Sequence, residues 1–432
     1  MVWLTEAQVV FETWGAVLSI LIISVLALAL CPLIYYLLSL YCVIGHFGRV
    51  REGQRGTAQF LPPASIIKPV RGVDHEAYEN FSSFCRLDYP EYEIVFAVAD
   101  MDDPVIPIIE KLRADFPDRP IRLITKVPHL GANDKINNLC QLAQKAKYDL
   151  LVMSDSDVRV EPDYLRAVVA PFSDPDVGVV TALYKSVSVG TVTSNLDALA
   201  MYMDSAPAAL VAKKIEGKMR FAFGWTMATS KKCLAEIGGW EAMVNYQSDD
   251  FELGKRVAER GHRVELIAKP VTMIFPNESI REQFKHELRW SISLKSVRPL
   301  GYCGLIFTHG LPWALLGAMA AFSTGLKAIA VSYLLAYLLL RVGLTWITGS
   351  WGLGDRQLAK ILWLVPVRDA LSFVIWIIGF FSDEITWRGL GYRVQKGRLL
   401  PILSTGSTPG APVGIGFLNN QLSANRQNLP RS

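Results

Sequence analysis

Residues 16–45 most limit how this chain can fold, because they contain no charged side chain. They read AVLSILIISVLALALCPLIYYLLSLYCVIG, and a helix needs only about 20 apolar residues to cross a bilayer. The stretch lacks the basic start and the small-residue cleavage site of a signal peptide, so it is interpreted as a retained anchor. The positive-inside rule then assigns the following segment to the cytoplasm. The residues behind this assignment are His46, Arg49, Arg51 and Arg55.

The charge pattern divides the chain into four parts, with residues 1–45 as the transmembrane anchor. Residues 46–300 carry most of the acidic and basic side chains and are interpreted as one cytoplasmic domain. Residues 301–382 are mostly apolar and are expected to form a C-terminal transmembrane region. Residues 383–432 form a basic tail, expected to be partly disordered because its end is rich in Gly, Pro, Ser and Asn.

Three apolar segments after the domain are each long enough to span a membrane: 302–325, 328–348 and 359–381. Three crossings would put the basic tail on the side opposite the cytoplasmic domain. The positive-inside rule opposes that placement, so we expect one segment to be re-entrant or interfacial. Arg368 and Asp369 lie inside the last segment, and we expect them to pair with each other because isolated charges in a membrane are unfavourable.

The overall charge and the cysteine positions narrow the classes of function. The net charge of +4 gives no support for nucleic-acid binding, which requires basic residues concentrated on one face. The six cysteines are scattered and form no C-x-x-C pair. Neither a disulfide framework nor a zinc site is therefore expected, and a reducing compartment fits the domain.

Within residues 46–300, apolar or β-branched runs alternate with segments of helical spacing, which predicts an α/β domain with a mostly parallel sheet. In such sheets ligands bind beyond the carboxyl ends of the strands, and Asp100 and Asp155 end two of the predicted strands. The predicted strands are 64–70, 92–100, 120–126, 149–155 and 177–183, and two of the predicted helices are 104–116 and 135–147.

Asp155 and Asp157 form a D-x-D motif at the end of a predicted strand. Two carboxylates this close can share one divalent cation, which in proteins typically binds one or two carboxylates together with substrate phosphates. The alternative is an ordinary strand-to-helix turn, in which Ser and Asp cap the next helix. The motif alone does not decide between these two interpretations.

A second acidic pair, Asp249 and Asp250, is predicted to lie in the first turn of a helix that stops at Gly261. One of the two carboxylates could be a general base that takes a proton from an acceptor hydroxyl. The alternative is that both simply interact favourably with the helix dipole. Taken by itself, the pair supports both interpretations equally.

The stretch HELRW places His286, Arg289 and Trp290 on one face of a helix just before the apolar region. They could anchor the helix at the membrane interface, where Trp and Arg are common. Alternatively, the planar fork of Arg289 binds a diphosphate beside an aromatic ring that closes an acceptor site. Lys135 in the loop GANDK poses a similar choice between contacting a phosphate and belonging to a plain loop before a helix.

In their order along the chain, these segments resemble the ceramide glucosyltransferase family. That family consists of inverting, family 2-like enzymes with a GT-A fold and includes bacterial hopanoid-associated relatives. The resemblance implies a UDP-sugar donor, a membrane lipid acceptor such as ceramide or a hopanoid, and Mn²⁺ or Mg²⁺ as cofactor. The matching stretches, within about 60–300, are KPVRGVD, LDYPEYEIVFAVAD, GANDKINNL, YDLLVMSDSDVRV, SDDFELG and HELRW.

The resemblance also implies roles for individual residues. Asp250 would be the general base with Asp249 beside it, Asp155 and Asp157 would bind the metal and the diphosphate, and Asp100 would contact uracil. The donor-binding residues it implies are Lys68, Asp100, Lys135, Asp155, Arg289 and Trp290, and the acceptor-site candidates are His286 and Trp240.

One departure from the family leaves the lipid open. The family usually has Gln or Arg three residues before the Arg of its last motif, where this chain has His286. Hopanoid-associated relatives therefore stay in consideration, and the bacterial inner membrane is favoured over the Golgi. Two other functions also remain. One is a processive polysaccharide synthase, which usually needs more membrane segments, and the other is a non-catalytic membrane protein that binds nucleotide sugars.

Overall fold

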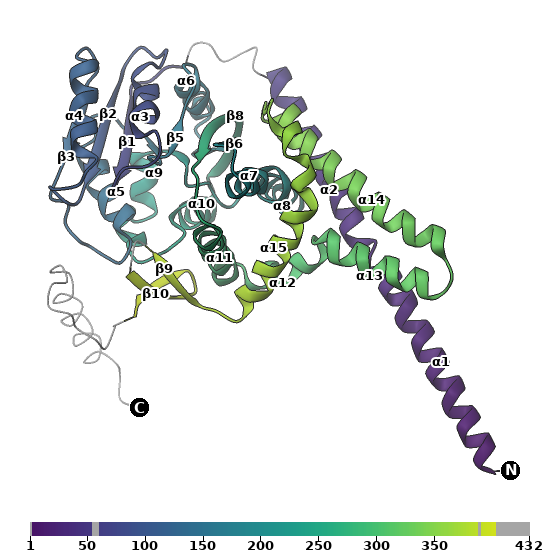
Figure 1. Ribbon diagram of the computed structural model, residues 1–432. Helices are drawn as coiled ribbons and strands as arrows, with labels where there is room; N and C mark the ends of the chain where they lie inside the picture. The colour runs from purple at the N-terminus through teal and green to yellow at the C-terminus, as the bar shows by residue number, and fades with distance from the viewer. Residues whose placement is uncertain (1, 54–59, 388–389, 403–432) are drawn as a thin grey trace, which may run out of the picture.

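The computed structural model describes residues 2–53, 60–387 and 390–402. Arg55, one of the basic residues named above, and the part of the expected tail from residue 403 onward lie outside these ranges. Figure 1 shows an α/β domain, a long helix leading into it from the N-terminus, and a group of helices formed by the later part of the chain.

An eight-stranded sheet forms the centre of the domain, in the order β3-β2-β1-β4-β7-β6-β8-β5. The first four strands in this order are parallel, β6 is parallel to β8, and the remaining three pairs are antiparallel. The mostly parallel sheet confirms the predicted α/β GT-A fold class. The strands are β1 (Ala64–Val70), β2 (Tyr92–Val98), β3 (Ile121–Ile124), β4 (Leu150–Ser154), β5 (Val158–Arg159), β6 (Val177–Ser188), β7 (Thr226–Ser230) and β8 (Arg263–Phe275).

Helices cover the sheet, and every residue of β1 and β2 is buried. Burial on both faces explains why these strands are continuous apolar runs instead of alternating ones. The two helices predicted at 104–116 and 135–147 are α4 and α5. The helices of the domain are α3 (Ala77–Cys85), α4 (Ile106–Asp115), α5 (Asp134–Lys145), α6 (Tyr164–Val169), η1 (Ala170–Ser173), α7 (Val192–Ala200), η2 (Met201–Ser205), α8 (Ala206–Ile215), α9 (Lys231–Glu236), η3 (Trp240–Met243), α10 (Asp249–Glu259) and α11 (Ile280–Val297).

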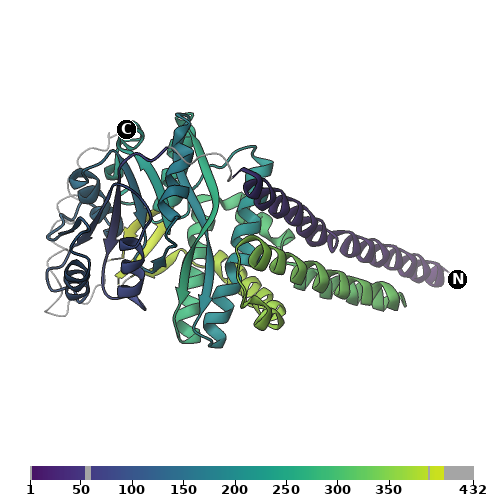
Figure 2. The same ribbon diagram turned by 90° about the horizontal axis from the view of Figure 1, so that it is seen from above.

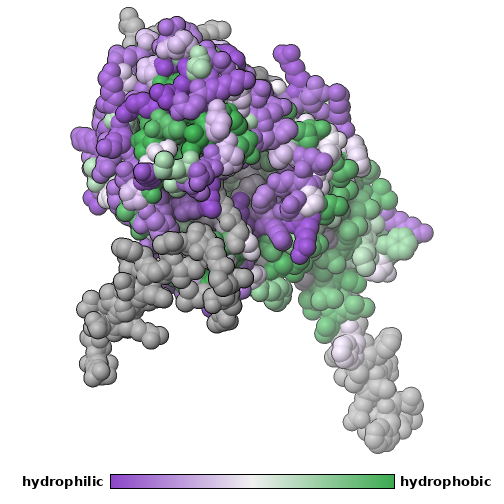
Figure 3. Space-filling model, turned by 60° about the vertical axis from the view of Figure 1, so that its left-hand side comes forward, coloured by the Kyte–Doolittle hydropathy of each residue, from purple (hydrophilic) through white to green (hydrophobic). Residues whose placement is uncertain are grey.

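Three helices of the described chain are long and apolar enough to cross a membrane: Ala16–Gly48, Lys327–Gly352 and Leu362–Phe380. A fourth is possible if Pro299–Phe307 and Gly310–Ser323, which meet at a bend of 42°, form one span. In Figures 1 and 2, α1 and α14 project away from the α/β domain, and the hydrophobic surface in Figure 3 covers this projecting part. The elements are α1 (Val2–Leu28), α2 (Cys31–Gly53), α12 (Pro299–Gly304), η4 (Leu305–Phe307), α13 (Gly310–Ser323), α14 (Lys327–Trp346), η5 (Ile347–Gly352), η6 (Leu358–Lys360), η7 (Leu362–Leu364) and α15 (Val365–Phe380).

The described part of the expected basic tail is folded, which the sequence did not predict. It forms an antiparallel sheet that lies against the α/β domain. The main-chain N–H of Leu399 donates to the carbonyl of Asn245 at 2.8 Å, and the N–H of Gln247 donates to the carbonyl of Gly397 at 2.9 Å. The strands of this C-terminal sheet are β9 (Glu384–Trp387), β10 (Leu390–Gln395) and β11 (Arg398–Pro401).

This contact limits how the apolar helices can cross a membrane. The α/β domain and the C-terminal sheet touch each other, so they lie on the same side of the bilayer. In a bilayer, the chain between them would cross an even number of times, which disfavours three complete crossings. The positive charge of the tail had led to the same expectation. Helix α15 packs against α11 of the domain and is the best candidate for the segment that does not cross.

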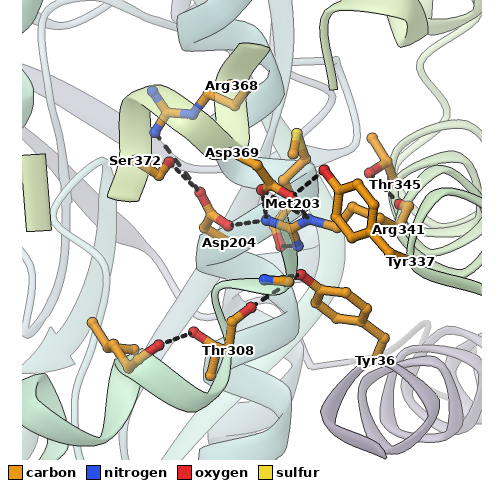
Figure 4. A network of polar contacts seen from close by, with 12 residues as sticks. Tyr36, Met203, Asp204, Thr308, Tyr337, Arg341, Thr345, Arg368, Asp369 and Ser372 are labelled. Carbon is orange, nitrogen blue, oxygen red and sulfur yellow. Dashed lines mark hydrogen bonds and ion pairs between the residues drawn. The ribbon is translucent and has the colours of Figure 1, made fainter. Parts of the chain in front are cut away.

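Arg368 and Asp369 do not pair with each other, so that prediction was wrong. Arg368 donates to Glu287 on α11, whereas Asp369 accepts from Arg341 on α14, with a closest N–O distance of 2.6 Å. Figure 4 shows Asp369 pointing to Arg341, whereas Arg368 points to Asp204, which lies 3.8 Å away. Consecutive residues of an α-helix leave its axis about 100° apart, so neighbours in the chain meet different neighbours in space.

Candidate active site

The end of β4 and the starts of α5 and α10 bring three predicted site residues together. Asp155 directly follows β4, Lys135 is in the first turn of α5, and Asp249 opens α10. The Nζ atom of Lys135 lies 2.8 Å from Asp155 Oδ1 and 3.1 Å from Asp249 Oδ2. One ammonium group therefore joins the D-x-D motif to the second acidic pair.

The charges around Lys135 keep it protonated. Burial by itself lowers the pKa of Lys135, but the carboxylates of Asp155 and Asp249 outweigh this effect and raise the net pKa. Burial also raises the pKa of Asp249, which the positive charge of Lys135 partly offsets. The cluster thus holds a fixed positive charge between two acids and partly neutralises their negative charge.

Asp250 is held in place by the main chain. Its Oδ2 accepts a hydrogen bond from the N–H of Gly224 at 3.0 Å, and its Oδ1 accepts one from the N–H of Phe251 at 2.7 Å. Burial, followed by the negative charge of Asp249, raises the pKa of Asp250 to about 6. A carboxylate with a pKa this close to neutral is ionised at pH 7 and still basic enough to accept a proton during catalysis.

The second carboxylate of the D-x-D motif lies among other acids. Burial raises the pKa of Asp157 to about 7, and the charges of Asp155 and Asp74 contribute to the rise. Its Oδ1 is buried and has no hydrogen-bond partner in the described part of the chain. Asp74, which accepts from the hydroxyl of Ser156, was not predicted, although it ends the quoted stretch KPVRGVD.

These carboxylates fit a divalent cation. A cation beside Asp155 and Asp157 would reduce the repulsion between them and would contact the unpartnered oxygen of Asp157. Among the described residues, no group of three or more Asp, Glu, His or Cys side chains is arranged to hold a metal ion. Phosphate oxygens of a substrate would therefore have to complete the coordination, as Mg²⁺ sites commonly require.

Lys68, Asp100 and Trp240 occupy different environments. Lys68 is fully buried, and its Nζ donates to the main-chain carbonyl of Asp155 at 2.9 Å. It therefore supports the D-x-D turn from the core and is not exposed to a bound donor. Burial lowers the pKa of Lys68 to about 7. Asp100 is exposed after β2. Trp240 was expected to face an acceptor site. Its side chain is only 1% exposed and lies in the core, so it does not face an open site.

The three HELRW residues lie on α11, next to the C-terminal sheet. His286 Nδ1 is 3.0 Å from a carboxylate oxygen of Glu278, and Trp290 is exposed. The guanidinium of Arg289 lies 5.9 Å from the ring centre of Trp387 on β9. The sequence correctly grouped these residues on one helix but did not predict the sheet that lies beside them.

Gly224 is a site residue that sequence reasoning missed. A Cβ atom at this position would lie 3.3 Å from Lys135 Nζ and 3.4 Å from Asp250 Oδ2, so a larger residue would press on the Lys135 ammonium group and shift it by a few tenths of an ångström. The rings of Phe223 and Trp225 on either side stack with their centres 4.6 Å apart. The available signal was this glycine between two aromatic residues in the stretch FAFGW.

The loops that carry Lys135 and the second acidic pair are bonded to each other and to the C-terminal sheet. The N–H of Ala132 donates to Asn245 Oδ1 at 3.0 Å, and Asn133 Nδ2 donates to the carbonyl of Tyr246 at 2.7 Å. The C-terminal sheet contributes the main-chain hydrogen bond from the N–H of Leu399 to the carbonyl of Asn245. Residues of the sheet and of α11 form a small apolar cluster over these loops: Ile292, Ile385, Tyr392, Val394 and Leu399.

Comparison with known proteins places this arrangement among glycosyltransferases. A family model described as Glycosyl transferase family 21 matches residues 24–400. The chain is 25% identical over 243 residues to ceramide glucosyltransferase 3 of Caenorhabditis elegans, covering 53% of this chain and 50% of that protein. It is 37% identical over 115 residues to the ceramide glucosyltransferase of Candida albicans, covering 24% and 21%. The chain thus spans about half the length of the first relative and less of the second.

Two solved structures show more distant similarity. The mannosyltransferase PcManGT from Pyrobaculum calidifontis, in complex with GDP-Man and Mn²⁺, has a TM-score of 0.45 and 15% identity, covering 82% of this chain and 99% of that one. S. aureus TarS 1–349 in complex with UDP-GlcNAc has a TM-score of 0.38 and 12% identity, covering 79% and 100%. The family match is more informative, because it includes the acidic cluster, α11 and most of the apolar helices. The chain belongs to glycosyl transferase family 21.

Proposed function

We propose that the protein is a membrane-bound inverting glycosyltransferase that moves a hexose from a UDP-sugar to the hydroxyl group of a membrane lipid, with ceramide as the acceptor. The family match and the names of the relatives support this proposal. The single observation that carries the chemistry is Asp250, a main-chain-bonded carboxylate with a pKa of about 6 beside the Lys135–Asp155 pair. The proposed base, Asp250, thus lies beside Lys135 and Asp155, the groups proposed to bind the donor.

The donor would be held by its diphosphate. Asp155 and Asp157 would bind it through Mn²⁺ or Mg²⁺, and a bound cation stabilises the negative charge that develops on departing UDP. Lys135 adds a positive charge in the same cluster. Arg289 would contribute its guanidinium from α11, and Asp100 would contact the uracil from the end of β2. Each of these groups would contact UDP, the leaving group of the reaction.

The acceptor would be activated by Asp250. Ionised at pH 7, this carboxylate would take the proton of the lipid hydroxyl as its oxygen attacks the anomeric carbon. The N–H groups of Gly224 and Phe251 hold the carboxylate still, so no reorganisation is needed during the step. A single displacement of this kind inverts the configuration at the anomeric carbon.

The apolar helices would allow an insoluble acceptor to reach the site of a soluble donor. Exposed apolar side chains along α1, α13 and α14 would contact lipid tails, and the basic residues after the first span favour a cytoplasmic catalytic domain. The presence of His286 in the last motif keeps a hopanoid acceptor and the bacterial inner membrane in the proposal.

The test is to incubate membranes containing the protein with UDP-glucose, UDP-N-acetylglucosamine or UDP-galactose. Each donor is combined with ceramide or with a hopanoid alcohol, with and without a chelator, and the lipids are analysed by mass spectrometry. We expect a chelator-sensitive lipid carrying one sugar. A long polymer would identify a polysaccharide synthase instead. UDP-sugar binding without any product from either acceptor would contradict lipid glycosylation.

A further inference from the structure

A row of five charged side chains connects the apolar helices to the α/β domain. Its members, in order, are Asp369, Arg341, Asp204, Arg368 and Glu287, so the charges alternate in sign (Figure 4 shows the first four). The Nη2 atom of Arg341 lies 2.6 Å from Asp369 Oδ1 and 2.6 Å from Asp204 Oδ1. Arg368 lies 3.8 Å from Asp204 and donates to Glu287. We call this row the charge chain.

The charge chain joins four elements that are far apart in the sequence. Asp369 and Arg368 belong to α15, Arg341 to α14, Asp204 to η2 and Glu287 to α11. All except Asp204 are buried. A buried charge is unfavourable unless it is paired, and the loss of one member leaves its partner unpaired. The four elements are therefore held in one relative position.

Hydrogen bonds around Arg341 fix its direction as well as its distance. The Nε atom of Arg341 donates to Asp369, and its Nη1 donates to the carbonyl of Met203 at 2.6 Å. The hydroxyl of Tyr337 donates to Asp369 at 2.9 Å. A planar guanidinium with acceptors on several sides can adopt only one orientation. The membrane end of the charge chain is thus rigid.

The other end of the charge chain lies inside HELRW. Glu287 immediately follows His286 and precedes Arg289 by two residues on α11. Glu287 points to Arg368 in the molecule's interior, so the bond between them sets how far α11 is rotated about its axis. That rotation determines where His286, Arg289 and Trp290 point.

We propose that Glu287 is a positioning residue. Through Arg368, the charge chain couples the apolar helices that contact lipid to the orientation of the HELRW face of α11, and so controls use of the lipid acceptor. This inference rests on the proposed function. A positioning role differs from a purely structural role, in which the loss of Glu287 would weaken the use of donor and acceptor to the same extent.

The test uses the full chain reconstituted in lipid bilayers and compares Glu287→Gln with Lys285→Gln. Both substitutions replace a charge by the same amide on the same helix, but Lys285 is exposed. The kcat and KM values are measured separately for the lipid and for the UDP-sugar, together with the affinity for UDP. Hydrogen exchange of residues 280–297 gives a readout that does not depend on turnover.

For Glu287→Gln we expect kcat/KM for the lipid to fall about 10-fold or more, because small misplacements of positioning groups strongly slow reaction. We expect the KM of the UDP-sugar and the affinity for UDP to change much less, by about threefold at most, because Arg289 is on α11 but Lys135 and Asp155 hold the donor from α5 and the end of β4. Exchange in 280–297 should be faster than in Lys285→Gln, and Glu287→Asp, which keeps the charge, should recover part of the lipid activity.

Two results would overturn the proposal. One is equal kinetics and equal exchange in Glu287→Gln and Lys285→Gln. The other is a parallel loss of lipid use, donor use and UDP affinity, which would mean a structural role only. If the unmodified protein glycosylated neither lipid, the proposed function would fail separately. The exchange comparison would still decide whether Glu287 holds α11.

Discussion

Asp249 and Asp250 are neighbours in the chain but have different surroundings in the structure. Asp249 faces the ammonium group of Lys135, whereas Asp250 receives two main-chain hydrogen bonds and no direct positive charge from a described ion pair. The first is suited to hold Lys135 in the cluster, and the second to accept a proton. The sequence predicted an acidic pair, and the neighbours of each residue separate the two roles.

Replacing Asp250 by Asn tests its role directly. The substitution keeps the shape and removes the base, so we expect kcat to fall by about 10² to 10⁴, the usual contribution of general base catalysis. UDP affinity should change little because the donor is held by other residues. Glycolipid formation and UDP binding are measured on the same membranes. Ordinary turnover by Asp250→Asn would show that another group is the base.

The raised pKa of Asp250 predicts how activity and stability depend on pH. Activity should rise with pH with a midpoint at about 6, because only the ionised carboxylate can take a proton. Its pKa in the folded protein exceeds the ordinary value of 3.8, so the stability it contributes is present below that value and is lost as pH rises through about 6.

The unfolding temperature of Asp250→Asn measures the second effect. As the pH rises from 4.5 to 7.5, the unfolding temperature of the variant should rise relative to that of the unmodified protein. In the unmodified protein the buried Asp250 carboxyl becomes charged over this range, whereas the amide of the variant stays neutral. Asp102→Asn, an exposed acid outside the cluster, is the control and should show no such trend. A pH-independent difference between Asp250→Asn and the unmodified protein would contradict the raised pKa.

At the scale of elements, the C-terminal sheet has a clear structural task. It bonds to the loop before α10, which in turn bonds to the loop before α5, and these loops lead into the helix turns that contain Asp249, Asp250 and Lys135. Its side chains also pack against α11. The sheet contains none of the predicted site residues, yet it holds three of the elements that supply them.

Shortening the chain at two places tests this task. Ending it after residue 382 removes the sheet, and we expect glycosyl transfer to be lost because the loops before α5 and α10 lose their support. Ending it after residue 402 keeps the sheet and is the matched control, which should retain most of the activity. Product formation and UDP binding are compared for both. Equal activity of the two shortened chains would contradict a supporting role.

At the scale of the whole molecule, the α/β domain and the C-terminal sheet must share one side of the bilayer. Helix α14 has 20 residues, a length of about 30 Å that matches the hydrocarbon core. The turn between α13 and α14 is exposed and contains Thr324, and the exposed Lys327 begins α14; both are polar residues suited to the opposite surface. The bent pair Pro299–Phe307 and Gly310–Ser323 would then cross together with α14 as a hairpin, with α15 packed along the domain.

Thiol labelling in sealed vesicles tests this arrangement. After the native cysteines are replaced by serine, single cysteines are introduced by Lys111→Cys in the domain, Gln395→Cys in the C-terminal sheet and Thr324→Cys in the turn. An impermeant maleimide should label the first two from the same face and the third only from the other. Labelling of Gln395→Cys from the face opposite Lys111→Cys would contradict the even number of crossings.

The sequence by itself determined the features that depend on neighbouring residues. The length of the uncharged stretch identified the anchor, the alternation of strand and helix patterns predicted the sheet, and acids at a strand end marked a site. These signals are local, because periodicity and charge can be read in a window of a few residues. They therefore predicted the correct fold class, and the resemblance to a known family, carried by the order of the motifs, brought Lys135, Asp155 and the second acidic pair into one hypothesis.

Only the tertiary structure decided which of these residues meet. Arg368 lies beside Asp369 in the chain, but its partner Glu287 is 81 residues away. Trp240 and Lys68 proved to be buried, and a segment expected to be a partly disordered tail became a sheet that supports two site loops. The partner of a charged side chain depends on which helices and strands pack together. That choice is made by burial over the whole chain and leaves no local pattern in the sequence.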